Sequence, residues 1–148
     1  MRNTATPLWR RWLARWWYAW GLSLSYAAAR AQDRSLFRAG ARAFGRAAGA
    51  WPAFAPAYFQ RGALRGRELG EVEAAVADLT RAAELDPAWP DPYLQRGLLH
   101  RFHGSPAAAR ADLARYLELA PEGAWRDEAA RLLADLAGED GGAGGPVV

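Results

Sequence analysis

The residues of this chain that could do chemistry are few, and its two histidines come first. His100 and His103 are three residues apart, so on one helix both imidazoles lie on the same face, a spacing that can hold a metal ion. No third ligand accompanies them, which favours a structural or surface role over a metal site. The chain has no cysteine, which excludes disulfides, thiolate metal sites and a cysteine nucleophile.

Carboxylates and a glycine-containing segment are the remaining candidates for chemistry. The acidic residues between positions 68 and 78 recur at spacings that are ordinary for a helix surface, and they form no evident catalytic pair. The segment from 62 to 70 contains glycines, but it lacks the lysine and hydroxyl residues that end a phosphate-binding loop. We therefore expect no enzyme, no metal and no cofactor.

These residues belong to a segment that repeats itself. A period of 34 residues over helix-forming sequence is typical of stacked helix–turn–helix units, which usually bind other proteins. No convincing strand alternation is present, so the expected fold class is all-α. The recurring residues are Gly70, Ala75, Leu79, Leu85 and Pro87, which return as Gly104, Ala109, Leu113, Leu119 and Pro121.

The two copies resemble the tetratricopeptide repeat. The family pattern has an aromatic residue and a glycine in the first helix, a small residue and a large apolar residue in the second helix, and a closing proline. The resemblance implies a solenoid of about three repeats with a capping helix at the end. The matching residues here are Tyr58, Gly62, Ala75, Leu79 and Pro87 in one copy, and Tyr93, Gly97, Ala109, Leu113 and Pro121 in the other.

The chain departs from the family pattern at two positions of each first helix. Arg61 and Arg96 stand where the family has leucine, and Arg65 and His100 stand where it has tyrosine. These changes leave the expected fold as it is and concern the surface of the first helix.

Glycines and prolines predict where the helices meet and where they end. Glycine at 62 and 97 allows two helix backbones to approach closely, and Gly70 and Gly104 can adopt the positive φ that ends a helix. Tyr58 and Tyr93 are 35 residues apart, whereas the two closing prolines are 34 apart. The extra residue must lie between positions 62 and 70, where we expect it to lengthen the end of the helix.

The pattern extends outward with less fidelity. Phe44, Ala47 and Pro52 take the positions of a second helix in a preceding repeat, with its helices expected within 16–31 and 36–50. The predicted organisation is an amphipathic Trp/Arg-rich helix start in 1–15, a degenerate first repeat in 16–54, a second repeat in 55–89 and a third in 90–123. A capping helix follows in 124–138, with apolar positions Ala129, Leu132, Leu133 and Leu136, and then a disordered tail in 139–148.

Charge is distributed unevenly along the chain. Up to Arg67 there are 12 arginines and one acidic residue, whereas from Glu68 onward there are 7 arginines and 15 acidic residues. The two parts carry net charges of +11 and −8, within a total of +3. Such a basic part can attract an anionic surface, or the two parts can neutralise each other along the stack or between molecules.

Five of the eight tryptophans lie near the N-terminus. On a helix, with about 100° between successive residues, apolar side chains gather on one face and Arg11 and Arg15 lie opposite. The residues of this segment that are candidates for contact with a membrane or polyanion are Trp9, Arg11, Trp12, Arg15, Trp16 and Trp20.

Three interpretations of this segment remain open. Its indoles can cover the end of the solenoid, it can lie on a membrane surface, or it can be a secretory signal with a small-x-small cleavage site at 29–31. A membrane-spanning helix is not expected, because only 14 uncharged residues follow Arg15 and about 20 are needed to cross a bilayer.

The resemblance also implies a concave groove lined by the first helix of each repeat. A peptide or helix would dock there through apolar anchors and a few hydrogen-bonding groups. The alternative is that the apolar members pack between helices. The groove residues carried over by position are Phe59, Gln60, Ala63, Arg67, Asp91, Leu94, Gln95, Leu98 and Arg101.

Two classes of function follow from these features. The favoured one is a non-enzymatic adaptor or scaffold whose partner is another protein or a peptide. The alternative is a peripheral membrane or polyanion-binding protein that recognises its target through the N-terminal helix. Nucleic acid is a less favoured partner, because the basic residues match no known binding fold, and self-association stays open. We expect a cytoplasmic protein that could also associate with a membrane. Export through a signal peptide is less favoured.

Overall fold

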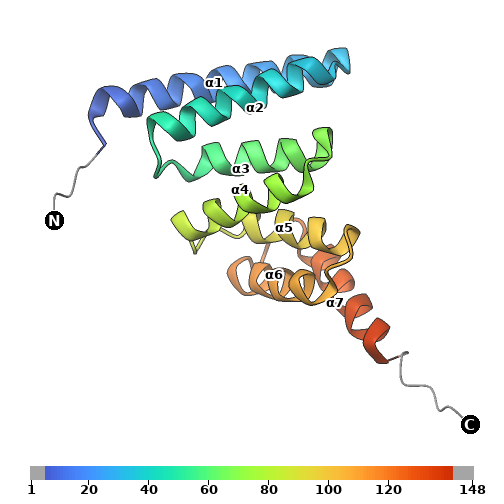
Figure 1. The fold of residues 1–148 in the computed structure, drawn as a ribbon. Coiled ribbons are helices and arrows are strands. Elements are labelled where there is room, and N and C mark those ends of the chain that lie inside the picture. Colours follow the sequence, from blue (N-terminus) through green and yellow to red (C-terminus); the bar gives the residue numbers. More distant parts are fainter. Residues whose placement is uncertain (1–5, 142–148) are drawn as a thin grey trace, which may run out of the picture. The chain divides into compact units, whose positions relative to one another are not determined.

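The computed structural model describes residues 6–141, with side chains described up to residue 138. Within these residues every regular element is a helix, which confirms the predicted all-α class. Two compact units divide the chain, unit 1 ending at Asp86 and unit 2 beginning at Pro87. The elements are α1 (Leu8–Ala31), α2 (Arg34–Ala50), α3 (Ala55–Leu64), the π-helix η1 (Arg65–Leu69), α4 (Val72–Leu85), α5 (Asp91–Phe102), α6 (Pro106–Leu119) and α7 (Arg126–Gly141) (Figure 1).

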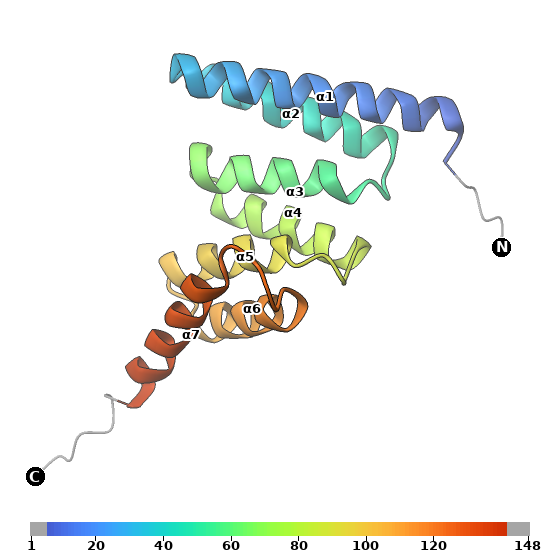
Figure 2. The same ribbon diagram turned by 180° about the vertical axis from the view of Figure 1, so that it is seen from behind.

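Each unit is built from antiparallel helix pairs. In unit 1, α1 lies alongside α2, and α3 with η1 lies alongside α4, while α2 and α3 join the two pairs (Figures 1 and 2). In unit 2, α5 pairs with α6, and α7 packs against α6. The order of pairs is that of consecutive helix–turn–helix repeats.

The helices of each pair meet where the first helix has a glycine. A methyl group added at Gly62 would lie 2.9 Å from Leu79 Cγ, and one at Gly97 would lie 3.2 Å from Leu113 Cγ. The close approach expected at both glycines is therefore confirmed. The pair α1–α2 follows the same plan, since a methyl group at Gly21 would lie 2.7 Å from the Phe44 ring.

The predicted helix ends are confirmed as well. Gly70 and Gly104 adopt φ of 71° and 81°, in the left-handed region that favours glycine. The second helices α4 and α6 end at Leu85 and Leu119, just before the closing prolines.

The extra residue of the second repeat lies in η1. This five-residue π-helix continues α3 and ends at Gly70, and the Glu71 N–H donates to the Arg65 carbonyl at 3.0 Å. A π-helix accommodates one added residue without breaking the helix. The prediction that the extra residue lengthens the end of this helix is confirmed.

The apolar core is divided between the units. In unit 1, Phe44 packs with Leu64 and Leu69, and Tyr18 and Phe37 cover this cluster. In unit 2, one cluster joins three helices, and Leu132 and Leu133 of α7 pack against it. Its buried members are Leu94, Ala109, Leu113, Tyr116, Ala129 and Leu136.

The terminal helices cross two of the predicted boundaries. The helix α1 has 24 residues and runs through position 16, so the helix predicted to start in 1–15 is continuous with the first helix of the first repeat. The helix α7 continues to Gly141, three residues into the segment predicted to be a disordered tail. The rest of that tail, residues 142–148, and residues 1–5 lie outside the part of the chain that the structure describes.

Candidate functional site

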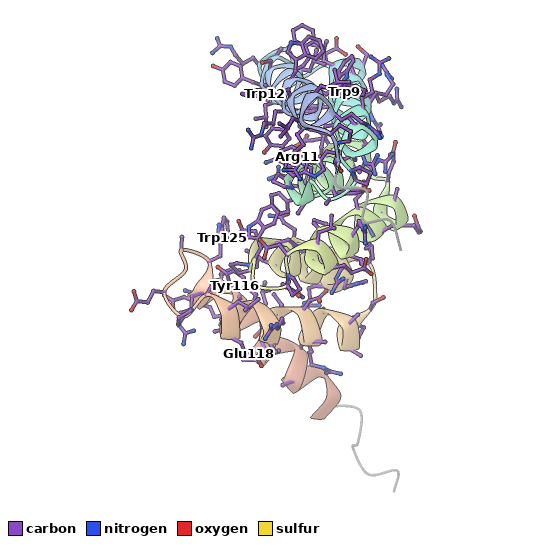
Figure 3. All side chains as sticks on the ribbon, turned by 90° about the vertical axis from the view of Figure 1, so that its left-hand side faces the viewer. Trp9, Arg11, Trp12, Tyr116, Glu118 and Trp125 are labelled. Carbon is purple, nitrogen blue, oxygen red and sulfur yellow. The ribbon has the colours of Figure 1, made fainter. Side chains whose placement is uncertain are left out.

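The most exposed apolar surface of unit 1 lies on α1. We call it the tryptophan face. Helical geometry places its members on one side of the helix, and Trp9 and Trp12 are labelled in Figure 3. Its members, with their exposed fractions, are Trp9 (65%), Trp12 (69%), Leu13 (40%), Trp16 (56%) and Trp20 (50%).

Small residues, and not these indoles, hold α1 against the rest of the unit. Ala14, Gly21 and Ala28 recur every seven residues and are buried. Of the five tryptophans of α1, Trp17 is the one that packs into a core cluster, beside Ala47 and Ala48. The Trp17 indole thus packs on the first repeat as the capping interpretation expects, whereas the other four indoles of α1 stay at least half exposed.

The arginines of this region lie around the aromatic rings. Arg11 points toward the α2–α3 connection, where its Cζ lies 5.1 Å from the centre of the Trp51 ring (Figure 3). Arg15 is exposed, and its Cζ lies 5.8 Å from the Trp12 ring. Of the two arginines predicted to oppose the tryptophans, Arg11 thus lies beside Trp51, and Arg15 lies beside Trp12 of the tryptophan face and not opposite it.

The groove residues on α3 differ in exposure. Phe59 and Gln60 are half-buried, Arg67 is exposed in η1, and Ala63 is buried at 5% exposure. Ala63 therefore lies beneath this face, whereas the other three side chains are at least partly accessible to solvent.

The groove residues on α5 show the same division. Gln95, Leu98 and Arg101 are half-buried, and exposed Asp91 accepts a hydrogen bond from Trp89 Nε1 at 3.1 Å. Leu94 is buried at 5% exposure in the core of unit 2, and Leu98 packs against that core. The alternative in which apolar groove residues pack between helices thus holds for Leu94 and in part for Leu98.

Arg61 and Arg96, which replace the family's leucine, do not form a free basic surface. Arg61 donates to both carboxylate oxygens of buried Asp78 at 2.8 and 2.6 Å, and Arg96 holds buried Asp112 at the same two distances. Arg65 adds a third bond to Asp78 at 2.9 Å. The sequence carried a signal for this pair, because Arg-Gly and Asp-Leu recur together in both copies.

A second missed signal lies in α1. Trp17 precedes Gly21 by four residues, as Tyr58 precedes Gly62 and Tyr93 precedes Gly97. This aromatic–glycine pair places α1 in register with the first helices of the other repeats. An indole at position 20, where the other copies have arginine, obscured the match.

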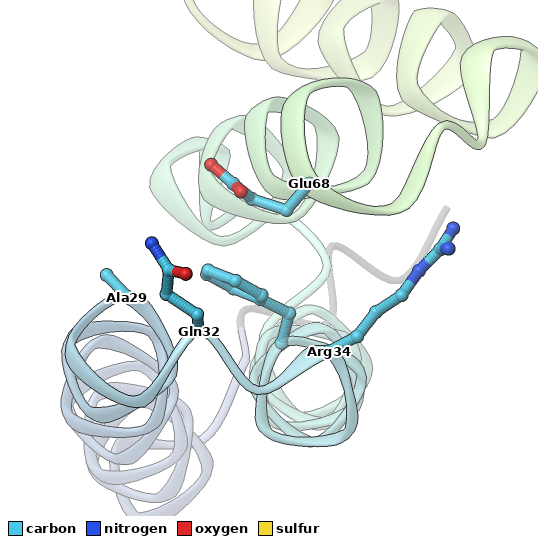
Figure 4. A pocket seen from close by; sticks show the side chains of 5 residues that line it. Ala29, Gln32, Arg34 and Glu68 are labelled. Carbon is cyan, nitrogen blue, oxygen red and sulfur yellow. The ribbon is translucent and has the colours of Figure 1, made fainter.

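A hollow of about 370 Å³ lies between the end of α1, the start of α2 and η1 (Figure 4). Its lining residues are Ala29, Gln32, Arg34, Phe37 and Glu68. The side chains of Gln32 and Glu68 point into it, whereas Arg34 donates to the Leu69 carbonyl at 2.7 Å. One carboxylate without a second titrating partner does not make an acid–base pair, so the hollow offers no evident catalytic chemistry.

The residues considered for chemistry do not converge. His100 is half-buried in α5, and His103 is exposed just beyond the end of that helix. Within the described residues, no group of three or more metal-ligating side chains is close enough to hold a metal ion. None of the described helices is both long and apolar enough to cross a membrane.

No protein-family model matches this chain, and no curated protein does. Solved structures match it in fold at low sequence identity. The tetratricopeptide-repeat domain of Arabidopsis OM64 is 22% identical with a TM-score of 0.72, and the match covers 85% of this chain and 98% of that domain.

Two further structures were solved with bound partners. The TPR2B domain of yeast Sti1, in a complex with pHsp70, is 18% identical with a TM-score of 0.70, over 83% of this chain and 98% of that domain. The type III secretion chaperone SycD of Yersinia enterocolitica, with a peptide of the translocator YopD, is 15% identical with a TM-score of 0.73. The match covers 85% of this chain and 93% of SycD. The tetratricopeptide-repeat fold that the residue spacing predicted is therefore confirmed.

Proposed function

We propose that this tetratricopeptide-repeat fold serves as a non-enzymatic protein-interaction module, which docks an extended peptide or a helix of a partner protein. The fold itself carries the proposal, because the TPR2B domain of Sti1 was solved in a complex with pHsp70 and SycD with a peptide of YopD. Stacks of helix pairs offer long surfaces for such segments.

The proposed docking residues lie on the first helices of the second and third repeats. A half-buried side chain suits this role, because its base is fixed by packing while its tip can still meet a partner. The buried Ala63 and Leu94 would support these surfaces without touching the partner. The docking residues are Phe59, Gln60 and Arg67 on the α3–η1 segment, and Asp91, Gln95, Leu98 and Arg101 on α5.

The chemistry of these residues suits a polypeptide. The Phe59 ring and the exposed part of Leu98 can receive apolar side chains. Gln60 and Gln95 occupy matched positions, and each amide can donate to and accept from a peptide backbone. Arg67 is exposed and attracts an acidic partner residue, whereas the carboxylate of Asp91 is already bonded to the Trp89 indole.

The proposal is tested by affinity capture of native-host proteins on the full chain, followed by mass spectrometry. Phe59→Ala with Gln95→Ala is compared with wild type and with a control variant, Glu73→Ala with Glu118→Ala, on the second helices. We expect a partner that the wild type and the control retain and that the docking variant loses at least tenfold, since a central aromatic contact costs about 2 kcal/mol. Equal capture by all three folded proteins would reject these faces as the docking surface.

A further inference from the structure

The tryptophan face is an apolar surface that the folding of unit 1 does not use. The helix α1 holds α2 through Ala14, Gly21 and Ala28, and the four indoles of the face keep 50–69% of their surface exposed. Contiguous aromatic surface of this kind marks a contact site in proteins.

This face occupies the position at which the next repeat makes a helix contact. Because Gly21 and Gly62 are equivalent in their pairs, Trp16 corresponds to Ala57 of α3. Ala57 is fully buried against Ala47 and Ala48 of α2. An indole in place of this alanine prevents an equally close approach of helices, so the tryptophan face is not a copy of the repeat–repeat contact.

The polar groups around the face suit phosphate and carbonyl oxygens. No hydrogen bond joins the indole N–H of Trp9, Trp12, Trp16 or Trp20 to any acceptor among the described residues. A hollow of about 230 Å³ beside Trp20 has Arg42 and Arg46 in its wall, and another of about 180 Å³ beside Trp12 has Arg11 and Arg15. Neither hollow is lined by a carboxylate, so at each of them the positive charge of the arginines lies beside apolar tryptophan surface.

The charge of α1 argues against a second copy of this helix as the partner that covers the tryptophan face. The helix has four arginines and no acidic residue, so two such helices face to face would bring like charges together without a counter-charge. The basic part of the chain, with its net charge of +11 up to Arg67, instead favours a negatively charged surface.

We propose that the tryptophan face binds the surface of a lipid bilayer that contains anionic lipids. The helix α1 would lie in the plane of the membrane, with its indoles at the level of the headgroups, where tryptophan is enriched. Their N–H groups would donate to lipid oxygens, and Arg15, Arg42 and Arg46 would meet phosphates. Binding would be peripheral, because none of the described helices can cross a membrane. The proposal does not depend on the docking residues of α3 and α5.

Flotation of the full chain with vesicles tests this proposal. Phosphatidylcholine vesicles with and without phosphatidylglycerol are compared at low and high salt. We expect the wild type to float with the anionic vesicles, less with the neutral ones, and less at high salt. Trp12→Ala with Trp16→Ala should weaken binding roughly tenfold or more, since each indole loses its buried apolar area.

Matched substitutions in unit 2 distinguish membrane binding by the tryptophan face from the general effect of removing any exposed tryptophan or arginine. Trp125 of unit 2 is another exposed indole (59%, Figure 3), so Trp125→Ala should float like wild type. Arg15→Gln and Arg42→Gln should each weaken binding roughly fivefold, whereas exposed Arg131→Gln in α7 should not. Circular dichroism checks that every variant keeps its helix content.

Three outcomes would overturn the proposal. The wild type could stay unbound with anionic vesicles at low salt, or the Trp12→Ala/Trp16→Ala protein could float as well as wild type. Light scattering without vesicles could instead show a dimer that the same substitutions dissociate, which would make a second copy the occupant. None of these results bears on partner capture through Phe59 and Gln95, so the two proposals fail independently.

Discussion

At the scale of single residues, the buried carboxylates of Asp78 and Asp112 depend on arginine. Each aspartate lies in the second helix of its repeat and is held by two bonds from an arginine of the first helix. A buried charge that loses its partner is costly, whereas removal of both charges together is close to neutral. The arginines therefore serve the fold, and the surface of the first helix is less basic than its sequence suggests.

Removal of one partner of this pair should destabilise the protein. We expect Asp112→Ala to lower the free energy of unfolding by about 3 kcal/mol, since the half-buried Arg96 then loses the carboxylate that accepts two of its hydrogen bonds. The double variant Arg96→Leu/Asp112→Ala, with the family's leucine, should recover most of that loss. Urea denaturation measures both values. Equal stability of Asp112→Ala and wild type would contradict this role for the pair.

Gly21 should be intolerant of a side chain. A methyl group there would lie 2.7 Å from the Phe44 ring, so Gly21→Ala should lower the free energy of unfolding by about 1–3 kcal/mol through overpacking. The matched control is Gly49→Ala in α2, where an added methyl meets nothing within 4 Å. The control should be neutral or stabilising, as alanine favours helix. Thermal unfolding in which both variants behave alike would argue against the close α1–α2 contact.

Asp33 at the start of α2 should titrate below the ordinary range. Hydrogen bonds from the Ser35 hydroxyl and the Ser35 backbone N–H lower the pKa of its carboxyl. Because the carboxyl of Asp33 has a lower pKa in the folded protein than in the unfolded chain, its ionised form stabilises the fold. This stabilisation is present at pH values above the ordinary pKa, and it is lost as the pH falls through the lowered pKa of the folded state. NMR titration should show this lowered pKa, and Ser35→Ala should move it back upward. An unchanged pKa in Ser35→Ala would remove the hydroxyl as the main cause.

At the scale of elements, spacing predicted more than composition did. The recurrence of glycine and proline correctly placed the ends of α4 and α6 and the close contacts at Gly62 and Gly97. It also placed the extra residue, although a π-helix could not be foreseen because the sequence does not show how a helix accommodates an added residue. The buried face of α1 was not predicted either. Large apolar residues suggested the packing face, but glycine and alanine allow the closer approach that the α1–α2 contact has.

Deletion of Gly66 tests this account of η1. The change gives the second repeat the length of the third, so α3 should continue as a regular α-helix to Gly70 without loss of the core contact of Leu69. We expect helix content and cooperative unfolding to be retained, as circular dichroism during heating can show. A protein that no longer unfolds cooperatively would mean that the π-helix is required for folding.

At the scale of the whole molecule, the fold could be predicted from the sequence, whereas the surfaces proposed for binding could be predicted only in part. A 34-residue period depends on backbone geometry, which sequence spacing reports directly. Exposure depends on the neighbours of each side chain, and Leu94 and Ala63 turned out to be buried although their positions match groove positions of the family. Most of the basic residues lie in unit 1, and this charge supports the proposed contact of the tryptophan face with an anionic membrane. The residues proposed to dock a protein segment lie elsewhere, on α3–η1 and on α5.

Hydrogen–deuterium exchange of the full chain, alone and with a partner protein identified by capture, tests the central claim most directly. The account predicts slower exchange in the partner's presence for backbone amides of α3, η1 and α5, around the docking residues Phe59 and Gln95, and unchanged exchange in α4 and α6. Protection confined to α1, or to the second helices α4 and α6, would contradict docking on the first-helix faces.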